Sequence, residues 1–146
     1  MGSFDTTGSF FGHGKESTGS FFRSVTEINV SYHPDIPIVV HTVTIRSLNS
    51  LVSELKLHPD VIKIDVEGFE YKVLQGAFQL LGSESPTLIV EIHPGQLKLS
   101  GDSDEQLLIL LKKAGYSVKT IDRNPNSLYT ILAKKKLNQK SKCFVT

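Results

Sequence analysis

The chain has 146 residues, a length that fits one domain with its own hydrophobic core. Its 16 Lys and Arg nearly balance its 15 Asp and Glu, so a net charge of +1 gives no global attraction to nucleic acid or to an acidic membrane. A single cysteine, Cys143, excludes an internal disulfide framework. No apolar run approaches the ~20 residues of a membrane-spanning helix, and the first ten residues lack a signal-peptide pattern. We therefore expect a cytoplasmic protein with neither nucleic-acid nor membrane partners.

The first segment, residues 1–36, is rich in Gly, Ser, Thr and Phe. It contains the sequence Thr-Gly-Ser-Phe-Phe twice, at 7–11 and 18–22. The favoured interpretation is a pair of short strands or a loop whose phenylalanines cover an exposed part of the core. The alternative is a mobile flap over a site, because glycines permit motion and aromatic rings can stack on a ligand.

The pattern becomes regular over residues 37–134. Beta-branched residues after Pro37 predict a strand, and leucines at helical spacing then predict a helix that ends before Pro59. A compact apolar strand, a helix with one apolar face and a second buried strand follow. The predicted elements are, in order, a strand at 38–45, a helix at 48–55, a strand at 61–65, a helix at 69–81 and a strand at 87–92.

A further helix is predicted after Ser103, which is spaced from Gln106 as in a capping box. Two strands, at 116–122 and 128–133, flank a turn rich in Asn and Pro. Apolar strands that alternate with single helices predict an α/β fold with a mainly parallel sheet, and the last two strands must close it as an antiparallel pair. Residues 135–146 are basic and lack apolar periodicity, so we expect a flexible tail.

Polar residues follow two of the predicted strands. Asp65, Glu67 and Gly68 follow the strand at 61–65, and Glu91 and His93 close the strand at 87–92. Ligands of open parallel sheets bind beyond the carboxyl ends of the strands. If these strands are neighbours, their carboxylates and the imidazole meet at one edge, or rim, of the sheet. Gly68 allows the backbone to approach a ligand closely or to adopt a positive φ. The sequence therefore predicts a binding or proton-transfer site there.

Each of these residues also has a structural interpretation. Asp65 or Glu67 can cap the helix that follows. Glu70 is interpreted as a negative charge in the first turn of that helix rather than as a ligand. His93, before a proline, can belong to an ordinary turn, and Glu91 can pair with a lysine on the adjacent strand. The site interpretation depends on their combination at adjacent strand ends.

These residues carry a family resemblance. The string Ile-Lys-Ile-Asp-Val-Glu-Gly-Phe-Glu at 62–70, followed by Val-Leu-Gln-Gly-Ala at 73–77 and Pro-Thr-Leu-Ile-Val-Glu-Ile-His at 86–93, closely resembles the FkbM family of S-adenosylmethionine-dependent methyltransferases. With residues 47–51, the similar span covers about the last two thirds of the chain. One departure is Asn49, where this family usually shows Asp, so a capping or charge role at this position is left open.

The resemblance implies a Rossmann-like class I methyltransferase fold. In it, Asp65 lies beside methyl donor and acceptor, with Gly68 on the cofactor side, and Glu67, Glu91 and His93 line the acceptor side. The motif does not fix which of these three acts as base. Transfer to an oxygen of a small-molecule or glycan-type acceptor is expected, with S-adenosylmethionine as cofactor and no metal ligand assigned.

The family's first half should also hold a strand with a glycine-rich turn for the donor and a strand ending in an acidic residue. The glycines before residue 37 do not follow a buried strand. We therefore expect the chain to represent the carboxyl-terminal portion of such an enzyme, truncated or split. By itself it should bind the donor weakly, and a partner chain can supply the donor-binding half.

Two other functions remain in competition. One is a non-catalytic remnant that acts as an interaction or binding module, pairing an exposed strand edge with a partner. The other is an unrelated α/β ligand-binding domain that uses Asp65 in an acidic pocket. The Glu-Gly-x-Glu continuation after Asp65 and the closing antiparallel strands argue against the second.

Overall fold

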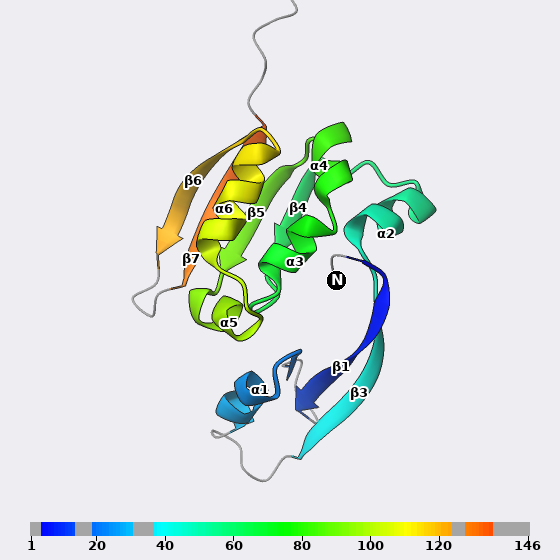
Figure 1. The fold of residues 1–146 in the computed structure, drawn as a ribbon, viewed down its shortest axis with the longest axis vertical. Coiled ribbons are helices and arrows are strands. Elements are labelled where there is room, and N and C mark those ends of the chain that lie inside the picture. Colours follow the sequence, from blue (N-terminus) through cyan, green and yellow to red (C-terminus); the bar gives the residue numbers. More distant parts are fainter. Residues whose placement is uncertain (1–3, 14–18, 31–36, 124–127, 136–146) are drawn as a thin grey trace, which may run out of the picture.

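The computed structural model describes residues 4–13, 19–30, 37–123 and 128–135. The turn at 124–127, Thr18 of the second repeat and the basic tail beyond Lys135 lie outside these residues. The described chain forms an α/β fold with two sheets (Figure 1). No helix of this part of the chain is long and apolar enough to cross a bilayer.

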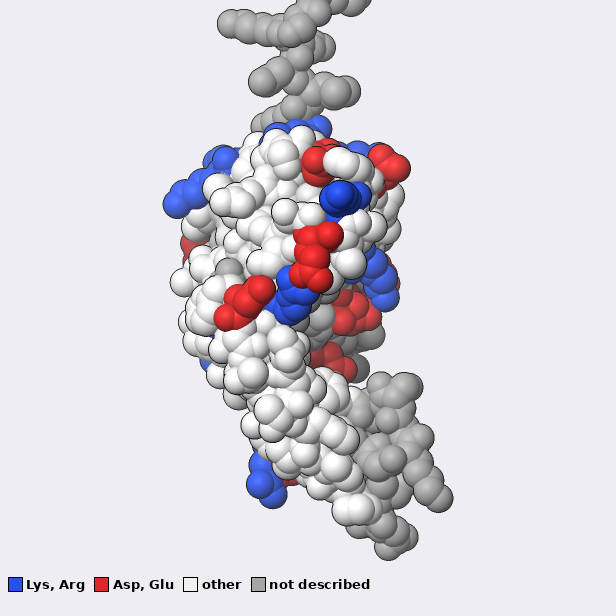
Figure 2. Space-filling view, turned by 90° about the vertical axis from the view of Figure 1, so that its right-hand side faces the viewer, with Lys and Arg blue, Asp and Glu red and all other residues white. Residues whose placement is uncertain are grey.

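The first sheet comes from the N-terminal part of the chain. It contains β1 (Thr6–His13), β2 (Gly19–Ser20) and β3 (Ile38–Ile45) in the order β2-β1-β3, with both pairings antiparallel. Helix α1 (Arg23–Val30) lies beside it, and the buried Thr26 hydroxyl donates to the carbonyl of Phe11 at 3.1 Å. β1 and β3 contain no Lys, Arg, Asp or Glu, and the surface that they form is almost entirely uncharged in Figure 2.

The second sheet contains the candidate site. Its order is β4-β5-β7-β6, made of β4 (Val61–Ile64), β5 (Thr87–Ile92), β7 (Tyr129–Lys135) and β6 (Tyr116–Arg123). Only the β4–β5 pairing within this sheet is parallel, whereas β5–β7 and β7–β6 are antiparallel. The predicted strands and the antiparallel closing pair are therefore confirmed, but the sheet is mixed rather than mainly parallel.

The strand at 38–45 was predicted for the same sheet, and this assignment is wrong. β3 pairs with β1 along its whole length, and Val39 and Val40 are 39% and 55% exposed. Beta-branched residues suit any pleated surface, whether a buried parallel strand or an exposed antiparallel one, so composition alone could not separate the two.

Helices cover one face of the second sheet, and further helices lie beside β4 and at the end of β5 (Figure 1). α2 (Leu48–Leu55) has the predicted bounds, and α6 (Asp104–Lys113) begins with the predicted capping box of Ser103 and Gln106. α5 (Pro94–Leu99), which follows His93 directly, was not predicted. Because the helices cover one face of the sheet, the burial of side chains alternates along β5. Leu88, Val90 and Ile92 are buried, and the residues between them are only half-buried.

The helix predicted at 69–81 is broken into α3 (Glu70–Gln75) and α4 (Phe78–Ser83). Gly76 lies at the break, and its carbonyl accepts a hydrogen bond from the Asn49 backbone at 2.8 Å. The Asn49 side chain in turn accepts from Leu80 N in the first turn of α4, at 3.0 Å. Asn49 therefore caps α4, because an amide oxygen serves this purpose as well as a carboxylate.

Candidate functional site

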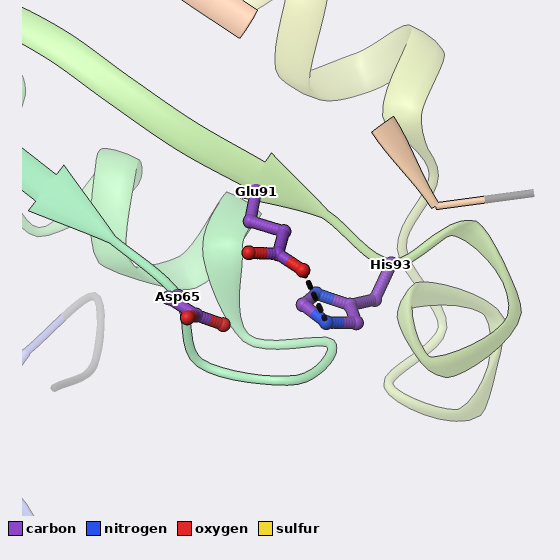
Figure 3. A group of neighbouring side chains, drawn as sticks. All are labelled: Asp65, Glu91 and His93. Atoms are coloured by element: carbon purple, nitrogen blue, oxygen red, sulfur yellow. Dashed lines mark ion pairs between the residues drawn. The ribbon is translucent and has the colours of Figure 1, made fainter. Parts of the chain in front are cut away.

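The parallel β4–β5 pair brings the predicted polar residues together. Ile64 is in register with Val90, so Asp65, just after β4, lies beside Glu91 in β5 and His93 just after it. One ligand atom from each of these three side chains lies within 4.8 Å of the others. Figure 3 shows the carboxylate of Glu91 between Asp65 and the imidazole of His93. We call these three residues the rim cluster.

His93 is held by a carboxylate that sequence reasoning interpreted only as a helix charge. Its Nδ1 lies 2.8 Å from Oε1 of Glu70, and the two side chains are only 6% and 0% exposed. Burial disfavours the charged imidazole, but the hydrogen bond with Glu70 and the negative charges of the nearby carboxylates outweigh it and raise the pKa of His93. The histidine is therefore fixed in orientation by a buried partner.

Glu70 is in the first turn of α3, as expected, but it points into the protein. With Val73 and Leu74 it occupies the buried positions i, i+3 and i+4 of the helix. This spacing was the available signal for a buried carboxylate. Oε1 of Glu70 also accepts a hydrogen bond from Gly68 N at 2.9 Å, whereas Oε2 has no partner among the described residues.

The loop between β4 and α3 has an unusual backbone. Glu67 and Gly68 both have positive φ, at 44° and 101°. The Gly68 carbonyl accepts from the Ser100 hydroxyl at 3.1 Å, and a Cβ at Gly68 would lie 2.6–2.8 Å from atoms of Gln96. The close approach that this glycine permits is therefore to α5.

The carboxylate of Glu67 is half-buried in this loop, and its Oε2 has no partner within the described chain. Burial, reinforced by the negative charges around it, raises the pKa of Glu67 despite the opposing effect of nearby His93. Glu67 thus contributes to the electrostatics of the rim cluster.

Two structural interpretations of the site residues are wrong. Among the described residues, neither Asp65 nor Glu67 accepts a hydrogen bond from the first turn of α3, and its N-cap residue Phe69 makes no side-chain cap. Lys63 pairs with Asp65, at 3.1 Å between Nζ and Oδ2, instead of with Glu91. Asp65 and Glu91 are 39% and 34% exposed at the side chain, which leaves both accessible from solvent.

The N-terminal sheet reaches this loop through aromatic side chains. The ring of Phe69, between Gly68 and Glu70, lies 4.8 Å from that of Phe21 and 5.1 Å from that of Phe22. Phe21 also meets Phe10 of the first repeat edge to face at 5.4 Å. Phe10, Phe21, Phe22 and Phe69 therefore form one cluster, which joins both repeats to the site loop and which we call the aromatic cluster.

The described residues thus define an α/β protein with polar side chains at the carboxyl ends of two parallel strands, the place where proteins of this architecture bind their ligands. A family model described as the methyltransferase FkbM domain matches residues 2–118. The chain belongs to this family, which confirms the resemblance and indicates methyltransferase activity.

The match begins at residue 2 and therefore includes the Gly- and Phe-rich segment, upstream of the motifs that carried the resemblance. No curated protein and no solved structure gave a significant match to the chain.

Proposed function

We propose that this protein takes part in methyl transfer from S-adenosylmethionine to a hydroxyl oxygen of a small-molecule or glycan-type acceptor. The observation that carries the proposal is the rim cluster, in which the buried Glu70 fixes His93 toward Asp65 and Glu91. Family membership supplies the donor, a sulfonium whose methyl group is attacked in line.

The chain's own residues would orient the acceptor and accept its proton. A hydroxyl must lose its proton as the new carbon–oxygen bond forms, so a base is needed within hydrogen-bond reach. Glu67, Glu91 and His93 are the candidates, since all three interact electrostatically around the same loop. Asp65 would lie between donor and acceptor.

The fit of S-adenosylmethionine to the described residues is partial. Its sulfonium and ammonium groups are cationic and suit a rim that carries Asp65, Glu67 and Glu91. Its adenosine has no comparable cradle in the described part of the chain, where the loop after β4 is closed by α5 and Glu70. We propose that segments other than the described residues, on the same polypeptide or on a partner chain, hold the adenosine.

The donor proposal is tested by calorimetry of the purified chain with S-adenosylmethionine. Weak binding, with a Kd far above the micromolar range, is expected because the adenosine would remain largely unbound. Micromolar affinity in this chain alone would show that the described residues suffice for the donor.

The site proposal is tested by Asp65→Asn, assayed with labelled S-adenosylmethionine and a panel of hydroxylated small molecules and sugars in the complete enzyme. A loss of about 100-fold or more in the rate is expected if Asp65 acts beside the reacting groups. Asp60→Asn is the matched control, because Asp60 is an exposed carboxylate at the opposite end of β4. Wild-type rates in both variants would contradict the role assigned to Asp65, and the absence of methyl transfer in the wild type would favour a non-catalytic binding module.

A further inference from the structure

The rim cluster contains a ring nitrogen, Nε2 of His93, that has no hydrogen-bond partner among the described residues. Nδ1 of His93 is hydrogen-bonded to Glu70. Nε2, on the other side of the ring, lies 3.9 Å from Oε1 of Glu91. This separation is too long for a hydrogen bond, although the imidazole is only 6% exposed. In Figure 3 a dashed line joins this nitrogen to the carboxylate of Glu91. The buried imidazole thus lies close to the carboxylates of Asp65 and Glu91 without a hydrogen bond to either of them.

The width of the gap suits one cation. Oxygen and nitrogen ligands lie about 2.0–2.2 Å from a bound transition metal, so ligand atoms around one ion are roughly 3–4 Å apart. The ligand atoms of Asp65, Glu91 and His93 lie within 4.8 Å of one another, and small rotations of the partly exposed Asp65 would bring its oxygen nearer.

We propose that Asp65, Glu91 and Nε2 of His93 bind a divalent transition-metal cation. One imidazole with two carboxylates favours ions such as Mn²⁺ or Zn²⁺ over Ca²⁺ and Mg²⁺, which prefer oxygen ligands alone. Three protein ligands also leave coordination positions open for a substrate. The Asp65 carboxylate has two oxygens, so one can serve the cation while Lys63 contacts the other, Oδ2.

The surroundings of His93 match those of a metal ligand. Metal-binding histidines usually donate their second ring N–H to a carboxylate or carbonyl, which fixes the tautomer and the ring orientation. Glu70 provides this carboxylate at 2.8 Å and is itself held by Gly68 N at 2.9 Å. Glu70 is therefore a positioning residue for the proposed cation site.

The role of the cation, unlike its binding, rests on the proposed function. A cation at the rim cluster would orient the acceptor hydroxyl and make its proton easier to remove. Glu91 and His93 would then be engaged as ligands.

The experiment measures metal binding directly, without donor or acceptor. The chelator-treated chain is titrated with Mn²⁺ and followed by electron paramagnetic resonance and calorimetry, with Zn²⁺ as competitor. One Mn²⁺ per chain is expected, with affinity weakened at least 10-fold by Asp65→Asn, Glu91→Gln or His93→Gln. Glu70→Gln should weaken it roughly 10-fold, the usual effect of losing an outer partner.

The chain offers a matched control in His58 and Glu84. This exposed pair has the same chemistry, with Nδ1 and Oε2 3.1 Å apart, and lies outside the rim cluster. His58→Gln and Glu84→Gln should leave Mn²⁺ affinity unchanged. Melting temperatures in chelator identify any variant that fails to fold, and added Mn²⁺ should raise the melting temperature of the wild type and the controls but not of folded Asp65→Asn.

Two outcomes would overturn the cation site. One is the absence of Mn²⁺ and Zn²⁺ binding by the folded wild-type chain, and the other is unchanged affinity in folded Asp65→Asn and Glu91→Gln. Failure of the proposed function is distinguishable, because specific cation binding without methyl transfer refutes only the enzymatic role. Methyl transfer that persists in chelator, without cation binding, refutes only the cation site.

Discussion

At the scale of single residues, two buried polar side chains each have a specific hydrogen-bond partner from a distant part of the chain. Glu70 is fully buried beside His93, and Tyr116, 3% exposed, donates its hydroxyl to the carbonyl of Pro86 at 2.9 Å. Both contacts join segments distant in the chain. An unpaired polar group at either place would lose its solvation without compensation.

Tyr116→Phe tests how much a buried hydrogen bond stabilises the protein, at a position away from the candidate site. The substitution removes a buried hydrogen bond, so it should lower the free energy of unfolding by about 1 kcal/mol at pH 8. Burial raises the pKa of Tyr116 from 10.0 to about 12, so the folded state keeps the phenol proton when the unfolded state has lost it. The wild type must therefore lose stability as the pH rises from 10 toward 12, and the variant is spared this loss.

Urea unfolding at pH 8 and pH 11 checks the prediction. The difference between wild type and Tyr116→Phe should narrow at pH 11. Tyr71→Phe, on a partly buried tyrosine that packs against the same core, is the control for loss of a phenol hydroxyl. A difference that stays constant between the two pH values would contradict the stated cause.

At the scale of elements, the loop between β4 and α3 is shaped by what packs on it. The Gly68 backbone is bonded on both sides, by Glu70 and by Ser100, and its Cα faces Gln96 of α5. These contacts fix where the chain turns from the strand into the helix. The positions of Asp65 and Glu67 at the rim therefore depend on α5.

Gly68→Ala should disrupt this arrangement. The added Cβ meets the Gln96 backbone at 2.7–2.8 Å, and a φ of 101° is strained for alanine, so a loss of about 2 kcal/mol or more in unfolding free energy is expected. Gly95→Ala, in α5 itself, is the control: its Cβ meets nothing within 4 Å, and helix propensity should leave the protein equally or slightly more stable. Thermal melts of both variants test this prediction. Equal melting temperatures would contradict a steric clash between residue 68 and α5.

The same scale shows what the sequence could predict. The apolar strands that became β4 and β5, and the capping box of α6, depend on local patterns, and these predictions are confirmed. The sheet to which β3 belongs depends on its pairing partner, β1, which composition does not specify. Gly76 likewise could not reveal a helix break, because the hydrogen bond that stabilises it comes from Asn49, 27 positions earlier.

At the scale of the candidate site, the rim residues Asp65, Glu91 and His93 were predictable because parallel neighbouring strands bring their carboxyl ends to one edge. The buried role of Glu70 was not predicted, since an acidic residue in a first helical turn is usually explained by the helix dipole. The contact of the second repeat with the site loop, through Phe21 and Phe22, was also not predictable, because it joins two sheets without local sequence signals.

At the scale of the whole molecule, the N-terminal sheet and the site-bearing sheet are joined at two places. The aromatic cluster connects Phe21 and Phe22 to Phe69 in the site loop. At the other end of β1, Asp5 accepts a hydrogen bond from Ser47 N at 2.8 Å, just before α2. The uncharged strand pair β1–β3 therefore contacts the site-bearing part of the protein near both of its ends.

Phe69→Ala should weaken one of these two connections selectively. The substitution removes the ring that Phe21 and Phe22 contact, whereas the core between the helices and the four-stranded sheet does not include Phe69. Amide hydrogen exchange in β1 and β3 should accelerate, while β5 and β7 keep wild-type protection, since local opening follows the loss of local contacts. Phe78→Ala removes the same ring from an exposed position in α4 and should leave β1 and β3 unchanged. Uniform acceleration in both sheets, or none in β1 and β3, would mean that the aromatic cluster does not hold the N-terminal sheet to the site loop.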